Sequence, residues 1–209
     1  MAPDLTPAIR AYHPADRDAV YDVCVRTAAA GGDARGLYLD DDLMPDVFAG
    51  PYVELAPELA FVLDVGGTAV GYVVGCADTV AFAAAFRERW LPAAAAKYPP
   101  PDEVAGVHAP SAWLVEALHD PERMVIAELA GYPAHLHIDL LPPYQGGGHG
   151  RLLIETFLAA AAREGAAAVH LGVNPENTRA LGFYEHLGFR PIEITSRQVF
   201  AVYLGRPTR

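Results

Sequence analysis

Two short apolar runs on either side of a glycine pair form the first clear pattern in the chain. Residues 59–64 and 69–75 are rich in β-branched and other apolar side chains, and Gly66-Gly67 lies between them. Glycine accepts the positive φ angles that tight turns between antiparallel strands require. The pattern therefore predicts a β-hairpin over residues 59–75.

The chain before this hairpin is predicted to form a strand over residues 9–12, then a helix and a loop. The helix begins near Asp16 and ends at Gly31-Gly32, because four residues between these points recur at the spacing of a helical turn. They are Val20, Val23, Cys24 and Thr27. Residues 32–58 are rich in Asp, Gly and Pro, and we expect a loop with one short helix there.

Two further helices are predicted after the hairpin, over residues 80–98 and 111–119. In the first of them, Phe82, Phe86 and Trp90 lie four residues apart and so share one helix face. The prolines at positions 99–101 end this helix, and a loop is expected from there to about residue 110.

The last third of the chain alternates between strand and helix patterns. We expect strands over residues 134–141 and 169–173, helices over 148–163 and 177–187, and a final strand or hairpin within 192–204. The chain has no internal repeat and no evident linker, so it is predicted to be one domain over residues 1–209. The expected fold class is α+β, a mixed α/β fold whose mostly antiparallel central sheet is flanked by helices.

Composition and charge narrow the classes of function. The 209 residues are 52% hydrophobic and 20% charged, as in a folded globular protein, and the formal net charge is −11. This charge argues against a nucleic-acid partner, which needs a basic face, and is compatible with a cationic acceptor such as an amine. No apolar run is long enough to span a membrane, and the N-terminal residues do not resemble a signal peptide. We therefore expect a cytoplasmic protein in which Cys24 and Cys76 stay reduced.

A glycine-rich segment between a strand and a helix carries the strongest functional signal. It consists of Gln145-Gly146-Gly147-Gly148-His149-Gly150-Arg151. Glycines let successive backbone N–H groups point into one concavity. The first turn of the following helix adds unpaired N–H groups and the positive end of the helix dipole. The segment therefore predicts a seat for a phosphate or pyrophosphate.

Two common nucleotide-binding loops do not fit this segment. A P-loop would end in Gly-Lys-Ser/Thr, and a dinucleotide-binding fold would need Gly-x-Gly-x-x-Gly after an early strand. Where a P-loop would have Gly-Lys-Ser/Thr, this chain has Gly150-Arg151-Leu152. Where the dinucleotide-binding motif would have its third glycine, this chain has Arg151. The segment instead resembles the Gln/Arg-x-x-Gly-x-Gly/Ala signature of the GCN5-related N-acetyltransferase (GNAT) superfamily, through Gln145, Gly148 and Gly150.

A second segment further along the chain strengthens the resemblance. It is similar to the GNAT pattern Asn-x-x-Ala-x-x-aromatic-Tyr-x-x-x-Gly-Phe, which is matched at Asn177, Ala180, Phe183, Tyr184, Gly188 and Phe189. In that family the Asn contacts the pantetheine or the adenine-diphosphate arm of CoA. The Tyr hydroxyl lies near the CoA sulfur, where a phenol can protonate the departing thiolate. Without the first segment, these aromatic residues would be interpreted as core side chains.

The resemblance implies acetyl-CoA as cosubstrate and a sheet that is splayed where acetyl-CoA binds. Pantetheine would enter the split beside the strand over residues 134–141, and the glycine-rich loop would hold the pyrophosphate. The cofactor-binding residues implied in this way are Leu140, Leu141, Gln145, Gly146, Gly147, Gly148, His149, Gly150, Arg151, Asn174, Asn177, Ala180 and Tyr184.

Several segments also resemble the acetyltransferase-like C-terminal domain of O-GlcNAcases, namely residues 60–63, 90–98 and 132–139. The animal domains of that kind are thought to have lost acetyl-CoA binding, whereas this sequence keeps the loop that they lack. The implied function is the transfer of an acetyl group to an amine by direct attack on the thioester. The alternative is a non-catalytic module that binds acyl-CoA or another protein, and a homodimer is among the assemblies that the sequence allows.

The strand before the loop offers candidates for the catalytic base. In many GNAT enzymes a base lies on this strand, and Asp139 is the candidate here, with Tyr184 as the catalytic acid. His135, His137 and Asp139 alternate along the strand, so they share the face opposite Leu140 unless a bulge shifts the register. The same three residues could ligate zinc in a hydrolase, but imidazoles also form ordinary hydrogen bonds in sheets. We expect no metal.

An acidic segment follows the first predicted helix. Asp40-Asp41-Asp42 lie there, with Asp33 and Asp46 nearby, in a region that often walls the acceptor pocket of GNAT folds. These residues would either attract a cationic acceptor or form a solvated loop.

Overall fold

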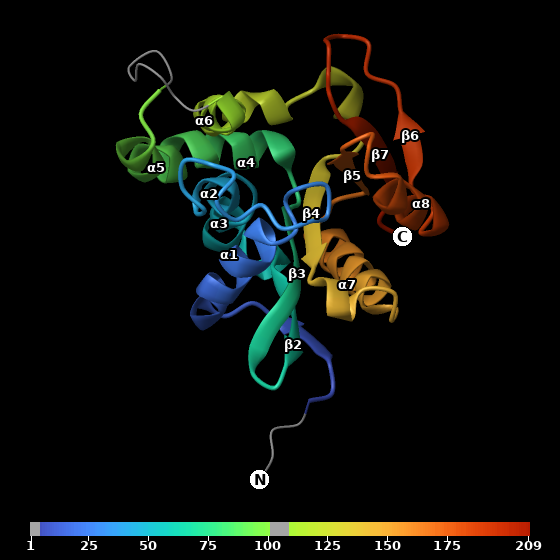
Figure 1. Cartoon of the computed structure of the whole chain (residues 1–209). Coiled ribbons are helices and arrows are strands. Elements are labelled where there is room, and N and C mark those ends of the chain that lie inside the picture. The colour runs from blue at the N-terminus through green and yellow to red at the C-terminus, as the bar shows by residue number, and fades with distance from the viewer. Residues whose placement is uncertain (1–4, 101–108) are drawn as a thin grey trace.

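Seven strands form one mixed sheet in the computed structural model, which describes residues 5–100 and 109–209 (Figure 1). Their order across the sheet is β1-β2-β3-β4-β5-β7-β6. They are β1 Ala8–Ala11, β2 Phe61–Val65, β3 Thr68–Cys76, β4 Ala134–Leu140, β5 Ala168–Val173, β6 Arg190–Ile192 and β7 Val202–Pro207. Neighbouring strands are antiparallel, except that β4 and β5 are parallel. This arrangement confirms the predicted fold class.

The two hairpins of the sheet follow the sequence pattern. β2 and β3 pair across Gly66 and Gly67, both of which have positive φ angles. At the other edge, β6 and β7 pair antiparallel, so the final predicted segment is a hairpin whose long loop is residues 193–201.

Eight α-helices flank the sheet within the described residues. They are α1 Arg17–Val25, α2 Leu43–Phe48, α3 Gly50–Leu55, α4 Thr79–Ala85, α5 Leu91–Lys97, α6 Ala109–His119, α7 His149–Arg163 and α8 Thr178–His186. α7 packs on β2, β3 and β4 from one face of the sheet, whereas α1 and α3 contact β3 from the other. One hydrophobic cluster joins these layers, and Cys24 and Cys76 are buried free thiols within it.

The helices before the β2–β3 hairpin differ from the sequence prediction at two points. α1 ends at Val25, before Gly31-Gly32, and Thr27 then turns its hydroxyl back to the carbonyl of Val23 (2.8 Å). Residues 32–58 hold two short α-helices instead of one, because a new helix begins at Gly50 directly after α2, with Pro51 in its first turn.

The predicted helix over residues 80–98 is divided in its middle. Phe86–Trp90 form a π-helical turn that joins α4 to α5, and Pro92 lies in the first turn of α5. Most of the loop expected up to residue 110 lies outside the described residues. Among the helices that are described, none combines the length and apolar character needed to cross a membrane.

Candidate functional site

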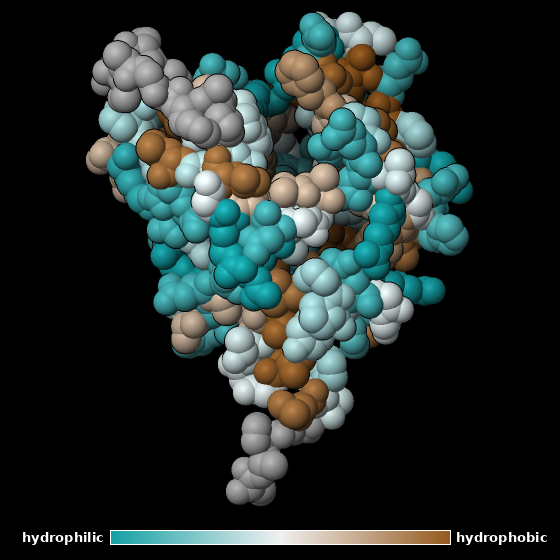
Figure 2. All heavy atoms as spheres, viewed as in Figure 1, coloured by the Kyte–Doolittle hydropathy of each residue, from teal (hydrophilic) through white to brown (hydrophobic). Residues whose placement is uncertain are grey.

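The sheet opens between its two parallel strands. β4 and β5 are paired only at Ala134–Val169 and His135–His170. Beyond these pairs, the edge of β4 that faces β5 has no strand partner among the described residues. A pocket of about 910 Å³ opens here, lined from both strands, and Figure 2 shows the molecule hollowed between its two upper lobes. The sheet is therefore splayed, as predicted.

The glycine-rich loop presents a row of free backbone donors. Gly146 and Gly148 have φ angles of 81° and 85°, which side-chain-bearing residues rarely adopt. Gly148 immediately precedes α7, a helix of 15 residues. In the described protein, no group accepts a hydrogen bond from the backbone N–H groups of residues 146–151. Six N–H groups without a protein acceptor therefore lie just before and in the first turn of a long helix, beside the positive end of its dipole, an arrangement that suits an anion.

Other predicted cofactor-binding residues lie at the two ends of this loop and contact neighbouring segments. The side-chain amide of Gln145 donates to the carbonyl of Leu140 (2.7 Å). The N–H of Leu141 donates to Val70 in β3 (3.0 Å), so it lies on the edge of β4 opposite β5 and is not free for a ligand in the split. Arg151 pairs with Glu155 one turn along α7 (2.7 Å), on an exposed part of the helix. His149, the first residue of α7, is half-buried.

The second motif packs directly against the first. A Cβ atom added to Gly150 would lie 3.1 Å from the ring of Phe183, so glycine allows α8 to approach the start of α7. Asn177 caps α8, because its side chain accepts a hydrogen bond from the N–H of Ala180 (3.0 Å). Asn174 lines the pocket, and its side chain accepts from the N–H of Glu176 (2.9 Å). The structure thus brings the two segments together.

Tyr184 has a buried ring and a hydroxyl without a protein partner. Its ring is 9% exposed and packs on Phe183 and Phe189, with centroids 5.2 and 5.5 Å away. No described residue bonds the hydroxyl, and no unpaired polar side-chain atom of the described residues is fully buried, so the hydroxyl stays open to solvent. Burial, and then the negative charge of Asp139, raise the pKa of Tyr184. The phenol therefore keeps its proton at neutral pH.

Asp139 lies across from Tyr72 on the neighbouring strand. The register between β3 and β4 is continuous, without a bulge, so His135, His137 and Asp139 share the sheet face on the side of α1 and α3. The hydroxyl of Tyr72 donates to Asp139 (2.6 Å). Burial raises the pKa of Asp139 to about 6, although hydrogen bonds from Tyr72 and Thr27 act in the opposite direction. A carboxylate of this kind is ionised at neutral pH and still basic enough to take a proton.

The two histidines of the same face are part of a neutral hydrogen-bond network. Both nitrogens of His135 are engaged, with the hydroxyls of Tyr52 and Thr79 at 2.8 Å each, and His137 also bonds to Tyr52 (3.1 Å). Burial lowers the pKa of both imidazoles, that of His137 to about 3. No cluster of three metal-ligating side chains occurs among residues 5–100 and 109–209. The network favours a structural role for these histidines.

The acidic segment is partly compensated by cations within the protein. Lys97 pairs with Asp40, Asp42 and Asp46, at 3.1, 3.0 and 3.5 Å, and Asp33 pairs with Arg35. None of these aspartates lines the pocket. The segment instead contributes the ring of Phe48, so the structure favours the structural interpretation of the acidic residues over an acceptor-attracting role.

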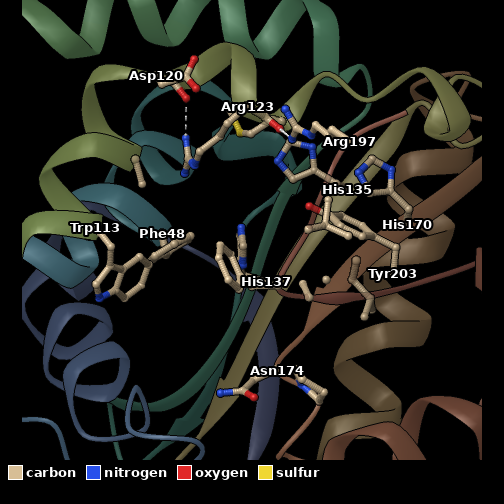
Figure 3. A pocket seen from close by; sticks show the side chains of 18 of the residues that line it. Phe48, Trp113, Asp120, Arg123, His135, His137, His170, Asn174, Arg197 and Tyr203 are labelled. Atoms are coloured by element: carbon tan, nitrogen blue, oxygen red, sulfur yellow. Dashed lines mark hydrogen bonds between the residues drawn. The ribbon is translucent and has the colours of Figure 1, made fainter. Parts of the chain in front are cut away.

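The pocket also contains residues that sequence reasoning missed. Figure 3 shows Phe48, Trp113, Arg123, Arg197 and Tyr203 around the histidines of β4 and β5. They come from segments far apart in the chain and belong to no motif.

Comparisons with known proteins agree with this fold. The acetyltransferase (GNAT) family model matches residues 33–189, and the chain belongs to this family. The crystal structure of SsHAT is 53% identical, with a TM-score of 0.91, over 98% of this chain and 99% of that one. A putative acetyltransferase of Salmonella typhimurium, solved with its cofactor acetyl-CoA, shares the fold at 16% identity and a TM-score of 0.54, over 98% and 95% of the two chains.

The narrower resemblance is confirmed as well. Protein O-GlcNAcase of Rattus norvegicus is 26% identical in an alignment 212 residues long that covers 98% of this chain. The chain spans only 23% of the length of that relative.

Proposed function

We propose that the protein transfers an acetyl group from acetyl-CoA to an amine by direct attack on the thioester. One observation carries the proposal. The row of free N–H groups at residues 146–151 and the pair of Asp139 and Tyr184 lie on segments that meet beside the split between β4 and β5.

The donor would be held by backbone groups. The pyrophosphate of acetyl-CoA would accept hydrogen bonds from the loop N–H groups at the start of α7. The pantetheine arm would run along the open edge of β4 as far as Leu140, with Asn174 on the other side of the split. The Salmonella structure with bound acetyl-CoA supports this donor, because the two chains share one fold.

The chemistry would need one base and one acid. The carboxylate of Asp139 takes a proton from the acceptor ammonium, and the free amine attacks the thioester carbonyl carbon. The C–N bond forms, the C–S bond breaks, and Tyr184 gives its proton to the departing thiolate. The second proton of the amine nitrogen, which is released as the amide forms, restores the phenol of Tyr184. Acid–base catalysis of this kind contributes about 100- to 10,000-fold, and holding the two reactants together contributes the remainder.

Binding and turnover test the proposal separately. Acetyl-CoA should raise the melting temperature because it binds the native state, whereas S-acetylpantetheine, which lacks the pyrophosphate, should raise it far less. Equal shifts of the melting temperature with the two compounds, or no shift with either, would refute the donor site.

Turnover is measured as the release of free CoA thiol in the presence of a panel of amines, peptides and amino sugars. Binding without turnover of any acceptor would make the protein a non-catalytic acyl-CoA-binding module.

A further inference from the structure

Two arginines lie at one end of the pocket. Arg123 belongs to the short turn Pro121–Met124 after α6, and Arg197 lies in the loop between β6 and β7. Figure 3 shows both at the end away from Asn174, with the pocket histidines between. Within the described residues, their hydrogen bonds go only to backbone carbonyls, from Arg123 to Asp120 (3.2 Å) and from Arg197 to Arg123. Within the described chain, neither guanidinium forms an ion pair with a carboxylate.

The charge of Arg123 is poorly compensated. Arg123 is half-buried, so water solvates its guanidinium incompletely, and this burial lowers its pKa although the charge of Asp120 acts in the opposite direction. Arginine nevertheless stays protonated in proteins, and a partly buried cation is costly unless an anion and hydrogen bonds balance it. The neighbouring imidazoles do not share this charge, because burial keeps His135, His137 and His170 neutral.

The acidic side chains of the pocket lie at its exposed rim. Glu116, Asp120 and Glu176 line the pocket, but all three are solvent-exposed, so water and salt screen them. Figure 3 shows the exposed Asp120 beside Arg123, and the two guanidinium charges of Arg123 and Arg197 exceed that single carboxylate, although the whole chain is acidic.

The loop that carries Arg197 is held in place. Glu128 accepts hydrogen bonds from the N–H and the hydroxyl of both Thr195 and Ser196, at 2.6 to 3.1 Å. These bonds lower the pKa of Glu128 to about 2, so the anchor is ionised over the whole physiological range. Arg197 follows directly and bonds to the carbonyl of Arg123, which brings the two guanidinium-bearing segments together.

We propose that this end of the pocket binds an oxyanion, a carboxylate or a phosphate, that belongs to the acetyl acceptor. The inference rests on the proposed function and names its substrate class: an amine with an anionic group at its far end. The planar fork of a guanidinium matches both oxyanions. Phe48 and Trp113, whose ring centroids are 6.1 Å apart, line the same pocket and suit an apolar middle part.

A matched set of arylethylamines tests the inference by binding. The probes are 4-(2-aminoethyl)benzoate and its carboxamide, and tyramine O-phosphate and tyramine. Calorimetric titration without acetyl-CoA should show the anionic member of one or both pairs bound about 10- to 150-fold more tightly, the range for a hydrogen bond to a charged group. A preference within the benzoate pair would indicate that the acceptor carries a carboxylate, and a preference within the tyramine pair would indicate a phosphate.

Arginine variants identify the groups responsible. Arg123→Gln and Arg197→Gln should each remove most of the preference for the anion. Arg26→Gln, a control directly after α1 that breaks an exposed pair with Asp22 (2.8 Å), should leave this preference unchanged. Arg123 also stacks over Phe48 at 5.8 Å, so Arg197→Gln, in an exposed loop, gives an independent result should Arg123→Gln fail to fold.

Three outcomes would overturn the inference. They are equal affinity within both pairs of probes, no binding of any probe, and a preference for the anion that survives in every folded arginine variant. The proposed function is judged separately by the acetyl-CoA titration. Acetyl-CoA binding and turnover of neutral amines as fast as their anionic partners would keep that function and refute the anionic acceptor.

Discussion

Asp139→Asn tests the catalytic base, and the structure sets the size of the effect. An amide has nearly the shape of a carboxylate and keeps an acceptor for the hydroxyl of Tyr72, now 2.6 Å from Asp139. With a pKa of about 6, Asp139 is about 90% ionised at pH 7 and about 10% at pH 5. The kcat/KM of the wild type should therefore rise about tenfold per pH unit below 6 and level off above it. The kcat/KM of the variant should be about 100- to 10,000-fold lower than that of the wild type. Its pH profile should also lack the inflection near pH 6.

The raised pKa of Asp139 also makes the stability of the protein depend on pH. The pKa of Asp139 rises from its ordinary value of 3.8 to about 6 on folding, so the native state binds more protons than the unfolded state between about pH 4 and 6. The contribution of Asp139 to stability therefore falls as the pH rises through this window, by at most about 3 kcal/mol. Asp139→Asn lacks this penalty and should melt no lower than wild type at pH 7.

Rates of thiol release from pH 5 to 8 and thermal melts of both proteins check these expectations together. A variant as fast as wild type on an accepted amine would refute the role of Asp139. So would a wild-type rate that does not change between pH 5 and 6.5.

Three further results are expected. Tyr184→Phe should slow turnover about 100- to 10,000-fold without a lower melting temperature, and a rate equal to wild type would remove Tyr184 from the mechanism. Gly148→Asp should abolish acetyl-CoA binding in a titration, while Gly165→Asp, with a similar φ of 89° at the other end of α7, should cost similar stability, about 1 to 2 kcal/mol, and bind normally. Elemental analysis of undialysed protein should find no stoichiometric zinc, and one equivalent would revive the hydrolase alternative.

Local patterns were enough to predict much of the fold. The hairpin over residues 59–75 depends on a glycine turn between two apolar runs, and both features act over a few residues. The loop before α7 could also be predicted from a local pattern, because Gly146 and Gly148 supply the positive φ angles of the turn. The family resemblance added the splay between β4 and β5, which no local pattern indicates.

Tertiary contacts decided what the sequence left open. The surroundings of Asp139 depend on Tyr72 and Thr27, which are distant in the chain, so its raised pKa has no sequence signal. The division of the helix over residues 80–98 at a π-helical turn has no clear periodic signature either. Arg123 and Arg197 lie in irregular segments that only the folded chain brings together.

A crystal structure of the protein with acetyl-CoA tests the central claim most directly. The account predicts pyrophosphate oxygens within hydrogen-bond distance of the N–H groups of residues 146–151, with the thioester in the split between β4 and β5. The CoA sulfur should then lie beside the hydroxyl of Tyr184. Acetyl-CoA bound elsewhere, or absent from the site at saturating concentration, would contradict the account.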